Sequence, residues 1–319
     1  MQLKSAVPPE LRRRRCGSAL RMQTGLAGYV KGETLKYSVF TVCMPEYAPE
    51  EAVKRLKAWG YDGVEWRFTP RPDHPAATAN FWNANKATID PRHWEREIPE
   101  VRKLCRKAGL KTPSLAAYAG CTDPRKYKPA IEAAAALGAP LVRVGVLGYD
   151  GTVGWKKLHA KALRAYEKVV KYAARFKVKP VIEIHMGIIT ASAAAAAEFC
   201  GHFSPNRIGV IYDPGNMVYE GYEQYQMGLE MLGKYVAHVH VKNSRWDVAG
   251  ATRHGAVAWK PTFAPMKNGC VDFEALVRAL KAVGYNGWLS FEDFNTGKKT
   301  DDKLKEDIKF LKTIERRTK

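Results

Sequence analysis

Short runs of β-branched and other apolar residues alternate with longer amphipathic stretches along most of the chain. The runs occupy residues 36–43, 63–68, 112–118, 141–146, 180–186, 208–213, 236–243 and 287–293. Between them, apolar positions recur every three or four residues, which is the spacing of one helix face. Strands that alternate with amphipathic helices are typical of parallel βα units. The pattern therefore predicts eight βα units.

The helical stretches carry start and stop signals. In the last stretch before residue 287, Asp272 is placed to cap the first turn and Gly284 to end the helix. Eight units fit a closed (β/α)₈ TIM barrel better than an open doubly wound sheet, which more often has fewer strands. No Gly-rich phosphate-binding fingerprint follows the first predicted strand, which weakens the doubly wound alternative further. We expect an α/β fold of the TIM-barrel class.

The length fits one barrel with an appendage. The chain has 319 residues, and single α/β barrels run to about 250 residues and more. We expect residues 36–319 to form the barrel and residues 1–35 a basic N-terminal extension that includes Arg12 to Arg15. Two interpretations of this extension remain open. It is either an arm that packs on a neighbouring subunit or a stretch that lies upstream of a natural start at Met22. Targeting is a weaker alternative because the stretch lacks an amphipathic pattern.

Two connections are too long to be simple links. Residues 69–96 follow the second predicted strand and residues 244–270 follow the seventh. In a barrel, loops after strands lie at the carboxyl-terminal face, where active sites form. These connections are therefore predicted substrate walls, with packing on the barrel top as the alternative. Their aromatic residues predict an apolar rim: Phe81, Trp82, Trp94, Trp246, Trp259 and Phe263.

Composition narrows the class of protein. Lys and Arg number 52 against 32 acidic residues, a formal charge of +20, but many of these cations recur at helical spacing as a solvated face. We therefore expect no nucleic-acid partner. The six cysteines include no C-x-x-C pair, which disfavours a zinc finger or a disulfide framework and favours a cytoplasmic protein. No apolar run approaches the roughly 18 residues of a membrane span, so we expect no membrane association.

Ionisable residues inside predicted strands are the strongest chemical signal, because strands buried on both faces are normally apolar. Period-two alternation places the members of each strand on one face, and inward is the direction in which different strands converge. Carboxylates and an imidazole that meet in this way would repel one another without a cation, which predicts a divalent metal: Mn²⁺, Co²⁺, Mg²⁺ or Zn²⁺. The residues concerned are Glu183, His185, Asp213, His238, His240, Lys242 and Glu292.

Five motifs in this order resemble the sugar phosphate isomerase/epimerase family of xylose-isomerase-like TIM barrels. They are VEW, EIH, YDPGN, HVHVKN and LSFED, and the resemblance covers residues from about 36 to 315. It implies one divalent metal, Mn²⁺ before the other three, bound by Glu183, Asp213, His240 and Glu292. Ketose 3-epimerases of this kind use the two metal-bound glutamates as acid and base, which correspond here to Glu183 and Glu292.

Other polar residues near the strand ends are assigned by position, except Glu65, which the resemblance implies to be a substrate-pocket residue. We expect His185 to take part in catalysis by donating to a substrate hydroxyl, with a bracing role as its alternative. His238 lies one layer deeper than His240 and is predicted to be structural. The expected substrate-binding residues are Glu65, Arg143, Asn216, Lys242 and Arg245. An internal ion pair is the alternative for Glu65 and Arg143, and a solvated loop position for Lys242 and Arg245.

Asn216 is also a departure from the resemblance. Ketose epimerases often carry a histidine three residues after the metal-binding aspartate, and this chain has Asn216 at that position. An amide can bind a hydroxyl group but cannot relay a proton. A simple ketose epimerase is thereby less well supported than the wider family.

The expected function is a divalent-metal-dependent sugar isomerase or epimerase that abstracts a proton next to a carbonyl and passes through an enediolate. One alternative is the catalytic subunit of a C-glycoside deglycosidase, which cleaves a 3-keto C-glycoside in a lyase-type reaction and has a small second subunit. Lower-ranked alternatives are a nuclease related to apurinic endonucleases and a non-catalytic binding barrel. We expect a small carbohydrate or glycoside as substrate and a homo-oligomeric assembly.

Overall fold

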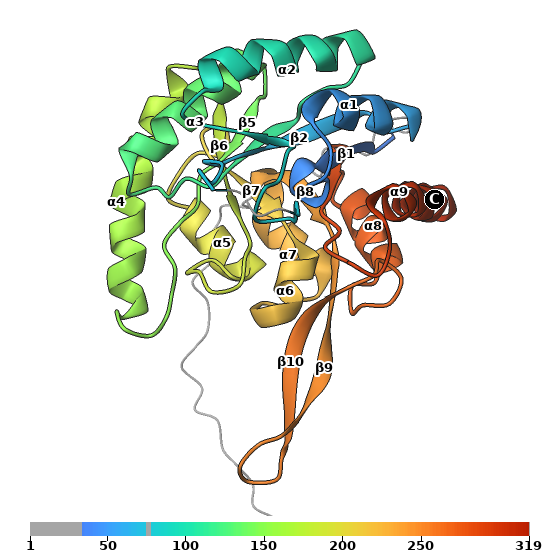
Figure 1. The fold of residues 1–319 in the computed structure, drawn as a ribbon. Coiled ribbons are helices and arrows are strands. Elements are labelled where there is room, and N and C mark those ends of the chain that lie inside the picture. Colours follow the sequence, from blue (N-terminus) through green and yellow to red (C-terminus); the bar gives the residue numbers. More distant parts are fainter. Residues whose placement is uncertain (1–33, 75–77, 319) are drawn as a thin grey trace, which may run out of the picture.

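The computed structural model describes residues 34–74 and 78–318, and it forms a closed barrel of parallel strands surrounded by helices (Figure 1). Neighbouring strands follow the order β1-β11-β8-β7-β6-β5-β4-β2, and β1 also pairs with β2, which closes the barrel. The predicted α/β fold of the TIM-barrel class is confirmed. Its strands are β1 (Lys36–Phe40), β2 (Gly63–Phe68), β4 (Ser114–Ala117), β5 (Leu141–Arg143), β6 (Lys179–Glu183), β7 (Gly209–Tyr212), β8 (Val236–Val241) and β11 (Trp288–Phe291).

Helices cover the outside of the barrel, as the amphipathic stretches predicted. They are α1 (Pro49–Ala58), α2 (Trp94–Ala108), α3 (Pro124–Leu137), α4 (Trp155–Ala174), α5 (Ala193–Cys200), α6 (Pro214–Glu220), α7 (Tyr225–Leu232), α8 (Phe273–Ala282) and α9 (Thr300–Arg317), with short 3₁₀ turns at Thr41–Cys43 and Gly233–Tyr235. The carboxylate of Asp272 caps α8 by accepting from the amides of Glu274 and Ala275. The predicted cap is therefore confirmed.

All eight predicted strands exist, but most end earlier than predicted. The run 180–186, for example, forms a strand only over Lys179–Glu183, and the run 141–146 only over Leu141–Arg143. The apolar character of such a run continues where the backbone has already left the sheet ladder. Because these ends carry the polar side chains, the chain turns just where the candidate site begins.

The long connection after β8 holds an antiparallel hairpin that the sequence pattern did not predict. Strands β9 (Asn243–Ala251) and β10 (Val257–Ala264) pair with each other and extend well beyond the barrel (Figure 1). Trp246 and Trp259 are substantially exposed on this hairpin. The connection after β2 contains β3 (Thr88–Ile89), which pairs with β2. Residues 1–33, nearly all of the predicted N-terminal extension, lie outside the described part of the chain.

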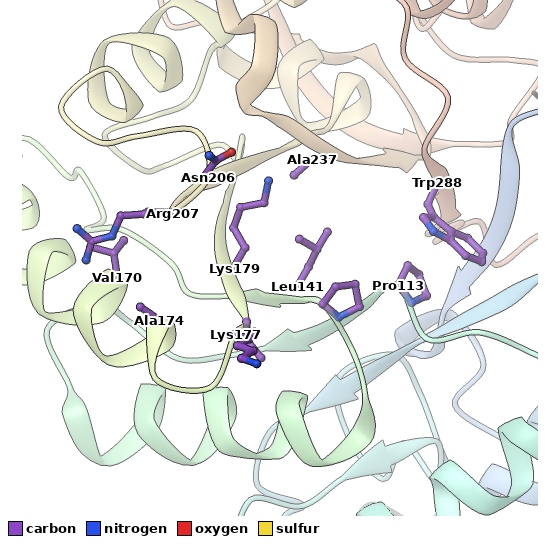
Figure 2. A pocket seen from close by; sticks show the side chains of 12 residues that line it. Pro113, Leu141, Val170, Ala174, Lys177, Lys179, Asn206, Arg207, Ala237 and Trp288 are labelled. Carbon is purple, nitrogen blue, oxygen red and sulfur yellow. The ribbon is translucent and has the colours of Figure 1, made fainter. Parts of the chain in front are cut away.

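A cavity of about 500 Å³ lies at the amino-terminal end of the barrel, opposite to the strand ends that carry the polar residues. Figure 2 shows Leu141, Lys179 and Pro113 among its walls, with Trp288 at one end. Its lining, as far as the chain is described, contains no carboxylate and no imidazole. It therefore lacks the groups for the chemistry predicted above, and this end of a TIM barrel commonly serves stability.

No helix in the described ranges is both long and apolar enough to cross a membrane.

Candidate metal and active site

Four side chains from four neighbouring strands meet inside the carboxyl-terminal end of the barrel. Glu183 ends β6, Asp213 follows β7, His240 lies on β8, and Glu292 follows β11. Asp213 and His240 have no exposed surface, and the two glutamates are nearly buried. Each residue offers one ligand atom, and these atoms all lie within 4.8 Å of one another. The structure thus brings together the four residues that the sequence predicted as metal ligands.

The imidazole of His240 faces the three carboxylates through its Nδ1 atom. This nitrogen lies 3.0 Å from Oε1 of Glu183, 3.4 Å from Oδ2 of Asp213 and 3.6 Å from Oε2 of Glu292. One ring nitrogen and three carboxylate oxygens therefore point into one small volume.

The ammonium group of Lys242 lies among the same carboxylates. Its Nζ is 2.7 Å from Oδ2 of Asp213 and 4.0 Å from Oε1 of Glu183, and it donates to Oε2 of Glu292. Lys242 follows His240 by two residues, so both side chains point inward. The ammonium supplies the positive charge that three converging carboxylates require.

Arg143 and Asn216 hold the other side of Glu183. Nη1 of Arg143 donates to Oε2 of Glu183 over 2.6 Å, and Nδ2 of Asn216 donates to Oε1 over 3.4 Å and to the carbonyl of Ile184 over 3.1 Å. The Arg143 guanidinium also packs over the ring of Tyr118, 4.8 Å from its centroid. These contacts fix the orientation of the Glu183 carboxylate at the cavity floor.

Glu65 lies beneath the cluster and does not line the cavity, contrary to the position expected for a substrate-binding residue. It is fully buried on β2, and its Oε2 lies 3.1 Å from Nε2 of both His238 and His240 and accepts from Ser290 over 2.7 Å. The hydrogen bond to Nε2 of His240 leaves Nδ1 directed at the carboxylates. His238 contacts Glu65 from one layer deeper, in agreement with its predicted structural position.

The carboxylates titrate differently because their neighbours differ. Burial alone would raise the pKa of Glu183, but Arg143 and His240 hold it well below its usual range. Burial raises the pKa of Glu292, and repulsion from Glu183 and Asp213 adds to the rise despite the nearby Lys242. Burial would lower the pKa of His240, yet the carboxylates around it raise this pKa well above its usual value.

The segment Asp213-Pro-Gly-Asn owes its composition to close packing. Asp213 caps α6 by accepting from the amide of Asn216 over 2.9 Å, with proline at the first helical position. A Cβ atom on Gly215 would lie 2.4 Å from Cγ and 2.8 Å from the carbonyl oxygen of Lys242. Glycine at this position therefore lets α6 approach β8 and keeps Lys242 in place.

A cavity of about 400 Å³ opens above this cluster at the carboxyl-terminal end of the barrel. Its polar floor consists of Arg143, Glu183, His185, Asn216, Lys242 and Glu292. Its apolar wall contains Trp82, Tyr118, Phe263 and Phe294, of which Phe294 contacts both Trp82 and Phe263 with ring centroids 5.0 and 4.7 Å apart. The cavity therefore presents a polar floor and an aromatic wall to a ligand.

The remaining predicted site residues divide between the cavity and other places. His185 lines the cavity, and its Nδ1 lies 2.7 Å from the carbonyl oxygen of Met186. Arg245 is on β9, where it pairs with Asp247 over 2.8 Å, and it does not line the cavity. Trp82 and Phe263 confirm part of the predicted aromatic rim, whereas Trp246 and Trp259 lie on the projecting hairpin.

Sequence reasoning missed three residues that shape the site. Tyr118 and Phe294 each follow a strand by one to three residues, and the position of aromatic residues just after strands was the available signal. Ser290 gave no signal, because a small hydroxyl residue in a strand is unexceptional. Its role follows only from the pairing of β11 with β8, where Ser290 stands opposite His240.

The donor set fits a divalent metal. Three carboxylates and one imidazole suit Mn²⁺, Co²⁺, Mg²⁺ or Zn²⁺. Oδ2 of Asp213 is buried and lacks a partner in hydrogen-bonding geometry, although Lys242 lies near it. Nε2 of His240 is engaged by a carboxylate, an arrangement that commonly orients metal-binding histidines.

Comparison with known proteins agrees with this architecture. The family model described as xylose isomerase-like TIM barrel matches residues 53–314. The chain belongs to this family. The resemblance seen in the sequence motifs is thereby confirmed.

The curated relatives include inosose dehydratases and a rhizopine catabolism protein. Inosose dehydratase of Geobacillus kaustophilus is 28% identical over 123 residues, which cover 36% of this chain and 39% of the relative. The rhizopine catabolism protein MocC of Rhizobium meliloti is 28% identical over 124 residues, or 37% of this chain and 38% of that protein. The matched stretch thus spans well under half the length of each of these relatives.

Solved structures show the same fold. The 3-keto-D-glucoside 4-epimerase YcjR from E. coli has a TM-score of 0.65 at 16% identity and covers 88% of this chain and all of that one. The IOLI protein with a bound zinc atom has a TM-score of 0.68 at 14% identity, covering 89% of this chain and 99% of that one. At such identities the likeness concerns the fold alone.

Proposed function

We propose that this protein is a divalent-metal-dependent enzyme that removes a proton from a carbon next to the carbonyl of a sugar or a related cyclic polyol. The observation that carries the proposal is the pair of carboxylates, Glu183 and Glu292, on the floor of one cavity beside His240 and Asp213. Epimerisation or isomerisation would follow from return of the proton to the other face or to the neighbouring carbon.

Glu183, Asp213, His240 and Glu292 would hold the metal, with Mn²⁺ expected before Co²⁺, Mg²⁺ or Zn²⁺. What a bound divalent ion would supply is polarisation of a substrate carbonyl, which acidifies the neighbouring C–H group. Glu183 and Glu292 come from strands separated by β7 and β8 in the barrel order, so they approach a ligand from different sides. This arrangement suits one carboxylate as base and the other as acid.

The other polar residues of the floor would position the substrate. Arg143, Lys242 and Asn216 present donors that can bind hydroxyl or carbonyl oxygens, and His185 can bind a hydroxyl group through its imidazole. The aromatic wall excludes water from one side and offers flat surfaces to a sugar ring or an attached apolar group. Arg245, which does not reach the cavity, has no part in this proposal.

Elimination is the second candidate, because it begins with the same proton abstraction. The named inosose dehydratases among the relatives favour it, and the aromatic wall would suit the aglycone of a C-glycoside. After the proton leaves, the bond to a group on the next carbon would break with its electron pair, and a carboxyl group would protonate the leaving atom.

Solvent-deuterium exchange separates these reactions. Purified protein repleted with Mn²⁺ would be incubated in deuterated buffer with ketoses, 3-keto-glucosides, inososes and aryl C-glycosides. Deuterium uptake together with formation of a new epimer or isomer would support the first candidate. Release of water or of an aglycone would support elimination. Glu183→Gln and Glu292→Gln should each abolish exchange, whereas the surface variant Glu230→Gln should not. Absence of both exchange and release with every substrate class would contradict proton abstraction.

A further inference from the structure

A second cluster of metal-ligating side chains lies on the outside of the barrel. His159 on α4 and Glu198 on α5 meet His202, which follows α5 by two residues. One ligand atom from each of the three lies within 4.8 Å of the others. The cluster is separate from the barrel mouth, since none of its members lines the cavity there.

The imidazoles of His159 and His202 contact different oxygens of the Glu198 carboxylate. Nε2 of His159 lies 2.6 Å from Oε2 of Glu198, and Nε2 of His202 lies 3.5 Å from Oε1. The contact of His159 is close, yet its Nε2 is buried and makes no hydrogen bond of acceptable geometry. A buried imidazole nitrogen without such a bond is available to bind a metal ion.

The ring of His159 is held in place by aromatic neighbours. It stacks on Trp155 with centroids 4.6 Å apart and an interplanar angle of 21°, and it meets the edge of Phe199 at 5.6 Å. His159 is only 8% exposed. A ligand fixed in this way loses little conformational freedom when it binds an ion.

The other two ligands are free to adjust. The side chains of Glu198 and His202 are 49% and 51% exposed, and they stand four residues apart on one side of the helix end. Small rotations of these side chains can bring all three atoms to the roughly 2.0–2.2 Å of zinc coordination. Water can complete the coordination on the exposed side.

From these contacts we infer that His159, Glu198 and His202 form a second metal site, which takes a borderline divalent ion such as Zn²⁺ and ties α4 to the end of α5. Two nitrogens and one carboxylate favour Zn²⁺ over Mg²⁺ or Ca²⁺, which prefer oxygen ligands. The site lies away from the substrate cavity, so its role is structural. This inference does not depend on the reaction at the barrel mouth.

Zinc alone is the probe for the test. Wild-type protein and the Asp213→Asn variant, which lacks one barrel-mouth ligand, would be titrated with Zn²⁺ against a chromophoric chelator. The variant should retain one zinc site, and His202→Ala added to it should weaken the remaining binding by roughly tenfold or more. Zn²⁺ should raise the Tm of Asp213→Asn but not that of the double variant.

The matched control is His254→Ala, which removes an exposed imidazole on the loop between β9 and β10. It should leave zinc binding unchanged. Should Asp213→Asn fail to fold, His202→Ala alone should lower the zinc stoichiometry of the full chain by one. Equal zinc binding by His202→Ala and its parent would overturn the inference, as would an equal loss in His254→Ala.

Discussion

Glu65 and His240 contact each other inside the barrel, with Oε2 of the carboxylate 3.1 Å from Nε2 of the imidazole. Since Glu65 is an acceptor when ionised, it keeps a proton on Nε2 of His240, and Nδ1 is the ring nitrogen that faces Glu183, Asp213 and Glu292 and would bind a metal after losing its own proton. Burial alone would raise the pKa of Glu65, but His238 and His240 hold it well below its usual range. Glu65 is thus a positioning residue for the metal-binding histidine.

We therefore expect Glu65→Gln to weaken divalent-metal binding by roughly 10- to 100-fold, as is typical of groups that orient a metal ligand. An amide can present its NH₂ group to Nε2, which favours the wrong tautomer of His240. The measurement is competition between the protein and a chelator for Mn²⁺. Ser290→Ala is the matched control: it removes one hydroxyl hydrogen bond to Glu65 without changing the contact between Glu65 and His240, and should change the affinity far less. Unchanged affinity in Glu65→Gln would contradict the positioning role.

Lys242 and a divalent metal would share the same carboxylates. Burial alone would lower the pKa of Lys242, but Asp213, Glu292 and Glu183 raise it above its usual value, so the side chain is an ammonium. Lys242→Met should destabilise the metal-free protein by about 3 kcal/mol, because it removes a buried cation from among the carboxylates. It should also tighten Mn²⁺ binding, since the competing charge is gone. Thermal unfolding with and without Mn²⁺ would show a larger metal-dependent rise in Tm than in wild type.

Lys303 provides the control for that experiment. It is also buried, but its Nζ donates to the carbonyl oxygens of Asp293 and Asn295 over 2.6 and 3.1 Å rather than to the carboxylate cluster. Lys303→Met should lower the stability and leave the Mn²⁺-dependent shift in Tm as in wild type. If Mn²⁺ raised the Tm of Lys242→Met by the same amount as that of Lys303→Met, Lys242 would not compete with the metal for the carboxylates.

The sequence predicted the barrel well because its signals are local. Alternating apolar runs located all eight strands, and side-chain alternation grouped His238, His240 and Lys242 on one face of β8. Depth along the barrel axis was harder to predict. Whether Glu65 reaches the cavity depends on how β2 is staggered against β8 on the far side, which no single strand encodes. The hairpin escaped prediction because its stretch mixes charged, small and aromatic residues without a clean alternation.

Gly215→Ala tests the close approach of α6 to β8. The added methyl group would meet the backbone and Cγ of Lys242 at distances that Cβ atoms do not tolerate. We expect a loss of about 1–3 kcal/mol in the free energy of unfolding, as for other overpacked interiors, with weaker Mn²⁺ binding because Asp213 and Lys242 move apart. Urea unfolding measures the first effect. At Gly120 an added methyl group would meet no atom within 4 Å. Gly120→Ala should therefore change the free energy of unfolding little.

Asp90 makes the stability of the connection after β2 depend on pH. Its carboxylate is almost completely buried, which alone would raise its pKa, but hydrogen bonds from Arg92 and from the amide of Arg71 lower the pKa to about 2. An aspartate in an unfolded chain has a pKa of about 3.9. The folded state therefore binds the proton less readily, so this stabilisation is complete above about pH 5 and lost as the pH falls toward about 2.

At pH 7 we expect Asp90→Asn to lower the free energy of unfolding by about 1–2 kcal/mol, a value reduced because Arg92 is partly exposed. The difference from wild type should shrink steadily between about pH 5 and pH 2, as measured by urea unfolding at several pH values. Asp73 offers the comparison, because it also pairs with Arg92, over 2.6 Å, but is 78% exposed. Asp73→Asn should show almost no difference from wild type at any pH. If the free energy of unfolding of Asp90→Asn stayed below that of wild type by the same amount across this range, the asparagine would disturb packing and the charge of Asp90 would contribute nothing.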